Sequence, residues 1–151
     1  MIGLDTSSLL PLAMRAHPLH EATRREIEQA DDTFAVAPLV LAEFVHCSTD
    51  PKRFAEPLTC VQALDWTDAL LDLPHVQMIV PDQAALRLWL RWMREFRLGR
   101  KRTLDTQLAA TLHLAGVKHL LTANPSDFRI FSVFELIVPQ LSGSEENQTQ
   151  P

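Results

Sequence analysis

Short apolar runs alternate with longer amphipathic segments along most of the chain. The apolar runs have the length and composition of buried strands, and the segments between them repeat with the period of a helix. The expected strands are residues 1–4, 34–37, 76–80, 117–122 and 135–138. The expected helices are residues 6–14, 20–30, 38–47, 58–73, 83–98 and 103–116. This alternation predicts an α/β fold with a parallel sheet and helices on both of its faces.

Side chains at the helix boundaries refine these expectations. Asp82 is predicted to cap the fifth helix and Thr103 the sixth, because short polar side chains can accept hydrogen bonds from free amide groups there. In the fifth helix, Leu86, Leu90 and Met93 are expected to form the buried face, with arginines on another face.

The chain has 151 residues, of which 46% are hydrophobic, enough for one domain with a sizeable core. We assign residues 1–140 to that domain. The segment 141–151 is polar almost throughout and is expected to be disordered. No apolar run approaches the roughly 18 residues of a membrane span, and the N-terminus lacks the pattern of a signal peptide. Cys47 and Cys60 match no metal-ligand spacing, so we expect both to be reduced thiols in the core of a cytoplasmic protein.

The net charge of −5 conceals a strong asymmetry. Residues 87–102 contain seven cations, half of those in the chain, and only Glu95 opposes them. Such a segment can bind a polyanion or an acidic partner, although a solvated helix face explains the same pattern.

Four acids border or interrupt apolar stretches: Asp5, Glu43, Asp105 and Asp127. Burying an ionised carboxylate without a partner costs several kcal/mol or raises its pKa until it is neutral. Four carboxylates in apolar surroundings in one small chain indicate a positive charge that they share. A divalent cation is the simplest candidate.

Each acid taken alone also has a structural explanation. Asp5 follows a strand and can cap the next helix, or its carboxylate can be oriented by the hydroxyls that follow it. Glu43 can form an internal ion pair or be exposed. Asp105 can stabilise the dipole of its helix, and Asp127 lies in a loop rich in turn residues.

Several other enzyme classes do not fit the sequence. An aspartyl phosphatase requires a second acid where Ser7 stands, and a phosphate-receiver domain requires an acid pair at a strand end, whereas Asp31 and Asp32 lie in a turn. The chain contains no glycine-rich phosphate loop, no Gly-x-Ser-x-Gly and no His-Glu-x-x-His.

Taken together, the four acids and their flanking residues resemble the PIN-domain family, and within it the VapC-type toxins of bacterial toxin–antitoxin pairs. The resemblance covers about residues 1–138. The matching features are Leu4-Asp5-Thr6-Ser7, Glu43 in the helix after the second strand, the segment Leu104-Asp105-Thr106-Gln107-Leu108-Ala109-Ala110, and the segment Leu121-Thr122-Ala123-Asn124-Pro125-Ser126-Asp127-Phe128.

The resemblance implies a three-layer α/β/α fold whose short-stranded central sheet is mostly parallel. It also implies an endoribonuclease that hydrolyses RNA with the help of one or two Mg²⁺ or Mn²⁺ ions. By the family pattern, Asp5, Glu43 and Asp105 are the three principal acids. Many relatives have an aspartate where this chain has Asn124, so we expect Asp127 to be the fourth acidic ligand and Asn124 to be a neutral one or to hold a water.

Further residues take roles within this picture. Thr6 and Thr122 are expected to support the metal ligands through their hydroxyls. Arg100, Lys101 and Arg102 lead directly into the sixth helix and are expected to hold RNA phosphates. The resemblance also implies a cognate antitoxin and a homodimer. The alternative is a PIN-like module that binds RNA or protein after losing the ability to cleave.

Overall fold

The computed structural model describes residues 1–141, and the segment 142–151, where most of the expected disordered tail falls, lies outside the described residues. The strands are β1 (Ile2–Leu4), β2 (Phe34–Val36), β3 (Val76–Met78), β4 (His119–Leu121) and β5 (Glu135–Ile137). The helices are α1 (Thr6–Ala13), α2 (His20–Gln29), α3 (Pro38–Ser48), α4 (Cys60–Leu71), α5 (Gln83–Glu95) and α6 (Thr103–Leu114). Three short 3₁₀ helices are η1 (Arg100–Arg102), η2 (Pro125–Asp127) and η3 (Arg129–Phe131). Every strand and helix expected from the sequence is present, with ends shifted by a few residues. Of the two cysteines expected in the core, Cys47 is buried, whereas Cys60 is exposed at the start of α4.

The five strands form one parallel sheet in the order β3-β2-β1-β4-β5. β1 lies at its centre, between β2 and β4, and Leu4 of β1 is in register with Leu121 of β4. β2 and β3 therefore lie on one side of β1, and β4 and β5 lie on the other, so the order of the strands reverses at β1. Ligands of parallel sheets bind beyond the carboxyl ends of the strands at such a switch point. The residues that follow β1 and β4, Asp5 and Thr122, both lie there.

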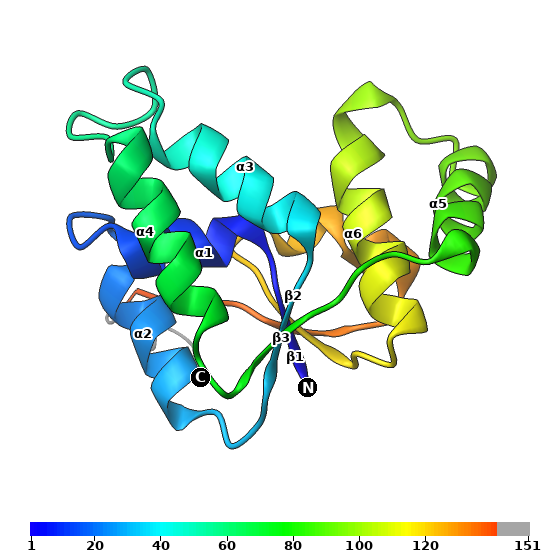
Figure 1. Ribbon diagram of the computed structural model, residues 1–151. Coiled ribbons are helices and arrows are strands. Elements are labelled where there is room, and N and C mark those ends of the chain that lie inside the picture. Colours follow the sequence, from blue (N-terminus) through cyan, green and yellow to red (C-terminus); the bar gives the residue numbers. More distant parts are fainter. Residues whose placement is uncertain (142–151) are drawn as a thin grey trace, which may run out of the picture.

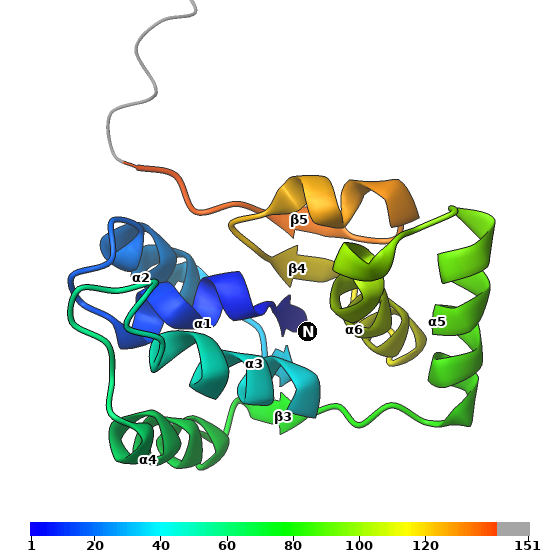
Figure 2. The ribbon, with the colours of Figure 1, turned by 90° about the horizontal axis from the view of Figure 1, so that it is seen from above.

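Helices cover both faces of the sheet, which confirms the three-layer α/β/α arrangement. α1, α2, α3 and α4 lie on one side, and α5 and α6 pack together on the other (Figures 1 and 2). α3 contacts α1 and α4 and also reaches α6. It thus connects the two helical layers near the carboxyl ends of the strands.

Leu112 of α6 packs closely against Gly3 of β1 in the core. Leu4, Leu112 and Leu120 are almost completely buried. A Cβ atom at Gly3 would lie 2.7 Å from Leu112 Cδ1, closer than packed side chains approach one another. Glycine at this position therefore allows the last turn of α6 to lie directly against the central strand.

The buried face of α5 differs from the one expected. Ala85, Leu88 and Trp92 are buried, whereas Leu86 and Leu90 are 38% and 42% exposed. α5 carries apolar residues on two faces, and the periodic pattern alone does not indicate which face meets α6. The aromatic ring of Trp92 determines it, because Trp92 stacks on Phe131 of η3 with ring centroids 5.0 Å apart.

One of the two predicted helix caps is confirmed. The Asp82 carboxylate accepts a hydrogen bond from the amide of Ala85 at the start of α5. The cap expected from Thr103 is wrong, because η1 runs directly into α6 and makes Thr103 the first helical residue. Its hydroxyl donates instead to the carbonyl of Arg100. Within residues 1–141, no helix has the length and apolar character needed to cross a membrane.

Candidate functional site

Asp5 has its carboxylate oriented by two hydroxyl groups, one from the first turn of α1 and one from the residue that follows β4. It occupies the N-cap position of α1 but makes no capping hydrogen bond with its side chain. Its Oδ2 instead accepts hydrogen bonds from Ser7 Oγ at 2.6 Å and from Thr122 Oγ1 at 2.9 Å. Asp5 is only 7% exposed. Burial raises its pKa, the two hydroxyl hydrogen bonds oppose that rise, and the charge of Glu43 adds to it.

The same hydroxyls connect β1 to the loop after β4. Ser7 Oγ accepts from the amide of Ala123 at 2.9 Å, and Thr122 Oγ1 accepts from the amide of Asn124 at 3.0 Å. Asp5 is therefore oriented by groups more than a hundred residues away in sequence. Ser7 is one of the hydroxyl residues considered from the sequence for orienting the Asp5 carboxylate, and it has that role in the structure, although it is not among the named site residues.

Glu43 lies in the middle of α3 and is partly exposed. Thr6 Oγ1 donates to Glu43 Oε2 at 2.7 Å, and Glu43 forms no ion pair with any residue in the range 1–141. The internal ion pair considered from the sequence is therefore wrong. The two adjacent hydroxyls after Asp5 have separate partners, since Thr6 supports Glu43 while Ser7 supports Asp5.

Asp105 and Asp127 lie on either side of an arginine. Arg102 Nε is 3.5 Å from Asp105 Oδ2, and Arg102 Nη1 is 3.4 Å from Asp127 Oδ1. Arg102 Nη2 also donates to the backbone carbonyl of Asp127. Asp105 is in the first turn of α6 and Asp127 is in η2, so Arg102 joins the start of α6 to the loop after β4.

The four carboxylates affect one another electrostatically. The pKa of Asp105 is raised from its ordinary value of 3.8 to about 6. Burial is the largest cause, followed by the charges of Asp127 and Asp5. Arg102 lowers the pKa, but by less than these effects raise it, and Glu43 adds a smaller increase. The site therefore carries more negative charge than its resident cation neutralises.

The acids do not form a ready-made coordination shell. Among residues 1–141, no three His, Cys, Asp or Glu side chains lie close enough together to hold a metal ion as they stand. The available ligands are nevertheless carboxylate oxygens, the type that Mg²⁺ prefers, and Mg²⁺ retains several waters when proteins bind it through one or two carboxylates. The charges of Asp127, Asp5 and Glu43, which add to the effect of burial on the pKa of Asp105, fit the same type of ion.

The three candidate RNA-binding cations are placed differently. Arg100 and Lys101 are exposed on η1, next to the start of α6. The Arg102 side chain is only 25% exposed and is paired with Asp105 and Asp127. Asn124 is exposed and precedes η2, and its carbonyl accepts from the amide of Asp127 at 3.1 Å.

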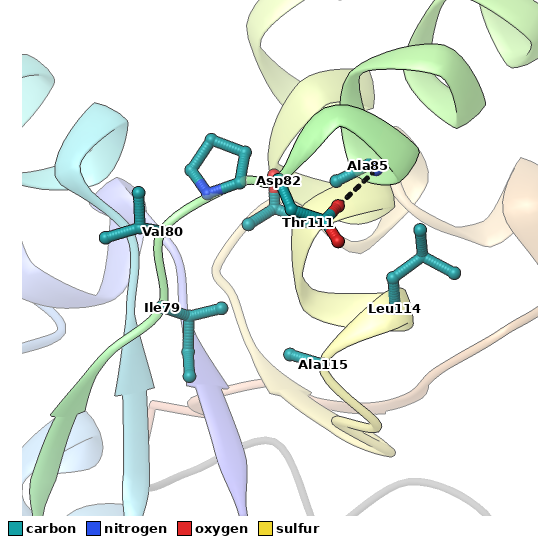
Figure 3. A pocket seen from close by; sticks show the side chains of 8 residues that line it. Ile79, Val80, Asp82, Ala85, Thr111, Leu114 and Ala115 are labelled. Atoms are coloured by element: carbon teal, nitrogen blue, oxygen red, sulfur yellow. Dashed lines mark hydrogen bonds between the residues drawn. The ribbon is translucent and has the colours of Figure 1, made fainter.

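A cavity of about 140 Å³ lies away from the acids, between the segment leading into α5 and the second half of α6 (Figure 3). Its lining includes the apolar residues Ile79, Val80 and Leu114 and the polar residue Thr111. Asp82 also lines it, but its carboxylate is already bonded to the amide of Ala85. Asp105 is at the opposite end of α6. The cavity therefore forms no part of the acidic site.

Solved structures with the same fold are toxins and toxin–antitoxin complexes. VapBC2 of Rickettsia felis, solved with a fragment of promoter DNA, aligns with a TM-score of 0.68 at 17% identity, covering 93% of this chain and 100% of that one. A toxin–antitoxin complex of Klebsiella pneumoniae aligns with a TM-score of 0.66 at 18% identity, covering 93% of this chain and 98% of that one. VapC20 of Mycobacterium tuberculosis, a toxin that cleaves the sarcin–ricin loop, aligns with a TM-score of 0.62 at 16% identity. The alignment covers 80% of this chain and 87% of that one. At these identities the likeness establishes the fold.

Sequence comparison is more specific about the family. A search of curated proteins found no significant match. The sequence profile of the PIN domain, however, matches residues 2–131, which include all four acids and nearly the whole sheet. The chain belongs to the PIN-domain family.

Proposed function

We propose that the chain is a metal-dependent endoribonuclease that hydrolyses RNA phosphodiester bonds with Mg²⁺ or Mn²⁺, and that it is the toxin of a toxin–antitoxin pair. One observation carries the proposal. Four carboxylates from four separate segments gather at the carboxyl edge of the sheet, and their repulsion contributes to the raised pKa of Asp105. A site of this kind is suited to binding hard cations.

In this proposal, Asp5, Glu43, Asp105 and Asp127 hold one or two ions. When bound, such an ion supplies Lewis-acid stabilisation of the phosphate and a water that is easily deprotonated. Phosphodiester hydrolysis needs little else, because its catalysis is mostly positioning and electrostatic stabilisation.

The neighbouring side chains have supporting roles. Ser7 and Thr122 fix the direction of the Asp5 carboxylate, and Thr6 does the same for Glu43. Hydroxyl donors also favour the ionised form of Asp5, which is the form that binds cations. Asn124 would provide a neutral oxygen ligand or hold a water, in place of the additional charge that an aspartate would bring.

The exposed cations are suited to the substrate. Arg100 and Lys101 lie five and four residues before Asp105 and are exposed, so they can contact RNA phosphates near the acids. A cognate antitoxin, a homodimer and a cytoplasmic location complete the proposal. Support for the antitoxin comes from the aligned structures, several of which are toxin–antitoxin complexes.

A cleavage assay tests the proposal. Purified protein is incubated with a structured RNA in the presence of Mg²⁺, Mn²⁺ or EDTA. Wild type and Asp65→Asn, a control at an exposed site on α4, should cleave with either metal and not with EDTA. Asp5→Asn should reduce cleavage by at least a hundredfold. Equal cleavage by wild type and Asp5→Asn would identify a contaminant, and RNA binding without cleavage would favour the non-catalytic module.

A further inference from the structure

A positively charged side chain of this chain already lies between two of the four acids. The guanidinium of Arg102 spans Asp105 and Asp127, and its contacts with the two carboxylates are 3.5 and 3.4 Å long. Charge-assisted hydrogen bonds between such groups are normally 2.7–2.9 Å long. Arg102 therefore neutralises the two acids at a distance and makes a close pair with neither.

The backbone of Arg102 is held by two hydrogen bonds, whereas its guanidinium makes one. Its amide donates to the carbonyl of Gly99 at 2.9 Å, and its carbonyl accepts from Thr106 Oγ1 at 2.6 Å. At the charged end, Nη2 bonds to the backbone carbonyl of Asp127, while Nε is buried without any hydrogen-bond partner in the structure. The guanidinium is thus anchored through a carbonyl, and the carboxylate oxygens remain incompletely bonded.

Those carboxylate oxygens are the groups that a divalent ion would need. A cation held beside them repels a second cation, and the effect is strong where the site is partly closed to water. The Arg102 side chain is 25% exposed and that of Asp105 is 29% exposed, so solvent screens this repulsion only in part.

We propose that Arg102 is a built-in counter-cation that competes with the divalent ion for Asp105 and Asp127 and thereby lowers the metal affinity of the site. This inference rests on the metal-dependent function proposed above. It assigns Arg102 a different role from Arg100 and Lys101, because its charge acts on the protein's own acids. The protein would consequently occupy its site only at metal concentrations high enough to displace the guanidinium from the carboxylates.

The test is a calorimetric titration of the full chain with Mn²⁺. Arg102→Gln should bind Mn²⁺ about tenfold more tightly than wild type, a difference of about 1.4 kcal/mol. Arg91→Gln serves as the matched control, because it removes one positive charge from an exposed position on α5. It should leave the dissociation constant unchanged.

A second variant covers the case in which Arg102→Gln does not fold. Arg102→Lys keeps the charge but lacks the planar fork that spans two acids, so it should tighten Mn²⁺ binding by about threefold. Equal or weaker Mn²⁺ binding in the folded Arg102 variants would overturn the inference and leave the proposed function standing. Absence of saturable binding in both wild type and Arg102→Gln would overturn both.

Discussion

Replacing Asp105 with asparagine should stabilise the protein in EDTA at pH 7.5. The pKa of Asp105 is raised from 3.8 to about 6, mainly by burial and by the charges of Asp127 and Asp5. Between these two pH values the folded protein binds more protons than the unfolded chain. The free energy of unfolding therefore falls as the pH rises through this window, and the penalty is complete above about pH 6. Asparagine has no charge and avoids the penalty.

The magnitude follows from the shift. Two pKa units correspond to about 3 kcal/mol, since one unit is about 1.4 kcal/mol. The Asp105 side chain is 29% exposed, and solvent screening reduces the effect to about 2 kcal/mol. For a domain of this size, 1 kcal/mol changes the Tm by about 2–4 °C, so Asp105→Asn should raise the Tm by about 4–8 °C.

Thermal unfolding followed by circular dichroism measures this difference. The gain should shrink as the pH is lowered from 6 to about 4, because Asp105 of the wild type becomes protonated. Asp65→Asn, at an exposed position on α4, should not change the Tm by more than about 1 °C at any pH. A Tm for Asp105→Asn that equals or falls below that of wild type at pH 7.5 would refute the reasoning, as would a gain independent of pH.

Three further predictions concern the supports of the site and its substrate. Gly3→Ala should lower the free energy of unfolding by about 1–3 kcal/mol in a urea titration, because the new methyl group would lie 2.7 Å from an α6 side chain; wild-type stability would contradict the close packing. Thr122→Val should cost about 1–3 kcal/mol by the same method, since it removes a hydroxyl that donates to the buried Asp5, whereas Thr122→Ser should cost less; equal losses would disprove the hydroxyl's role. The double variant Arg100→Glu and Lys101→Glu should weaken RNA binding and flatten its salt dependence in a filter-binding assay; unchanged affinity would exclude the RNA contact.

The order of strands and helices was predictable because it depends on local patterns. Each strand is a short apolar run, and Asp82 caps α5 through residues close in sequence. Where a helix has two apolar faces, its sequence alone does not show which face is buried. The apolar faces of α5 are one example, and only its packing against α6 and Phe131 buries Trp92 rather than Leu86.

The positions of the acids in the sequence were predictable, but their partners were not. Asp5 depends on Thr122, which is far along the chain, and the bond forms because β1 and β4 are neighbours in the sheet. Arg102 appeared to be one of three similar cations before α6. Its pairing with Asp127 depends on η2, which folds next to α6 only in the complete domain.

Binding of a divalent ion by Asp5 together with the other acids should stabilise the folded protein. The direct test compares how much a divalent ion raises the Tm of wild type and of Asp5→Asn. Thermal unfolding of both proteins is measured in EDTA and in increasing Mg²⁺ or Mn²⁺. Either ion should raise the Tm of wild type, because a ligand that binds only the folded state stabilises it, and Asp5→Asn should lose most of this increment. The same increment in both proteins would contradict a metal site at Asp5.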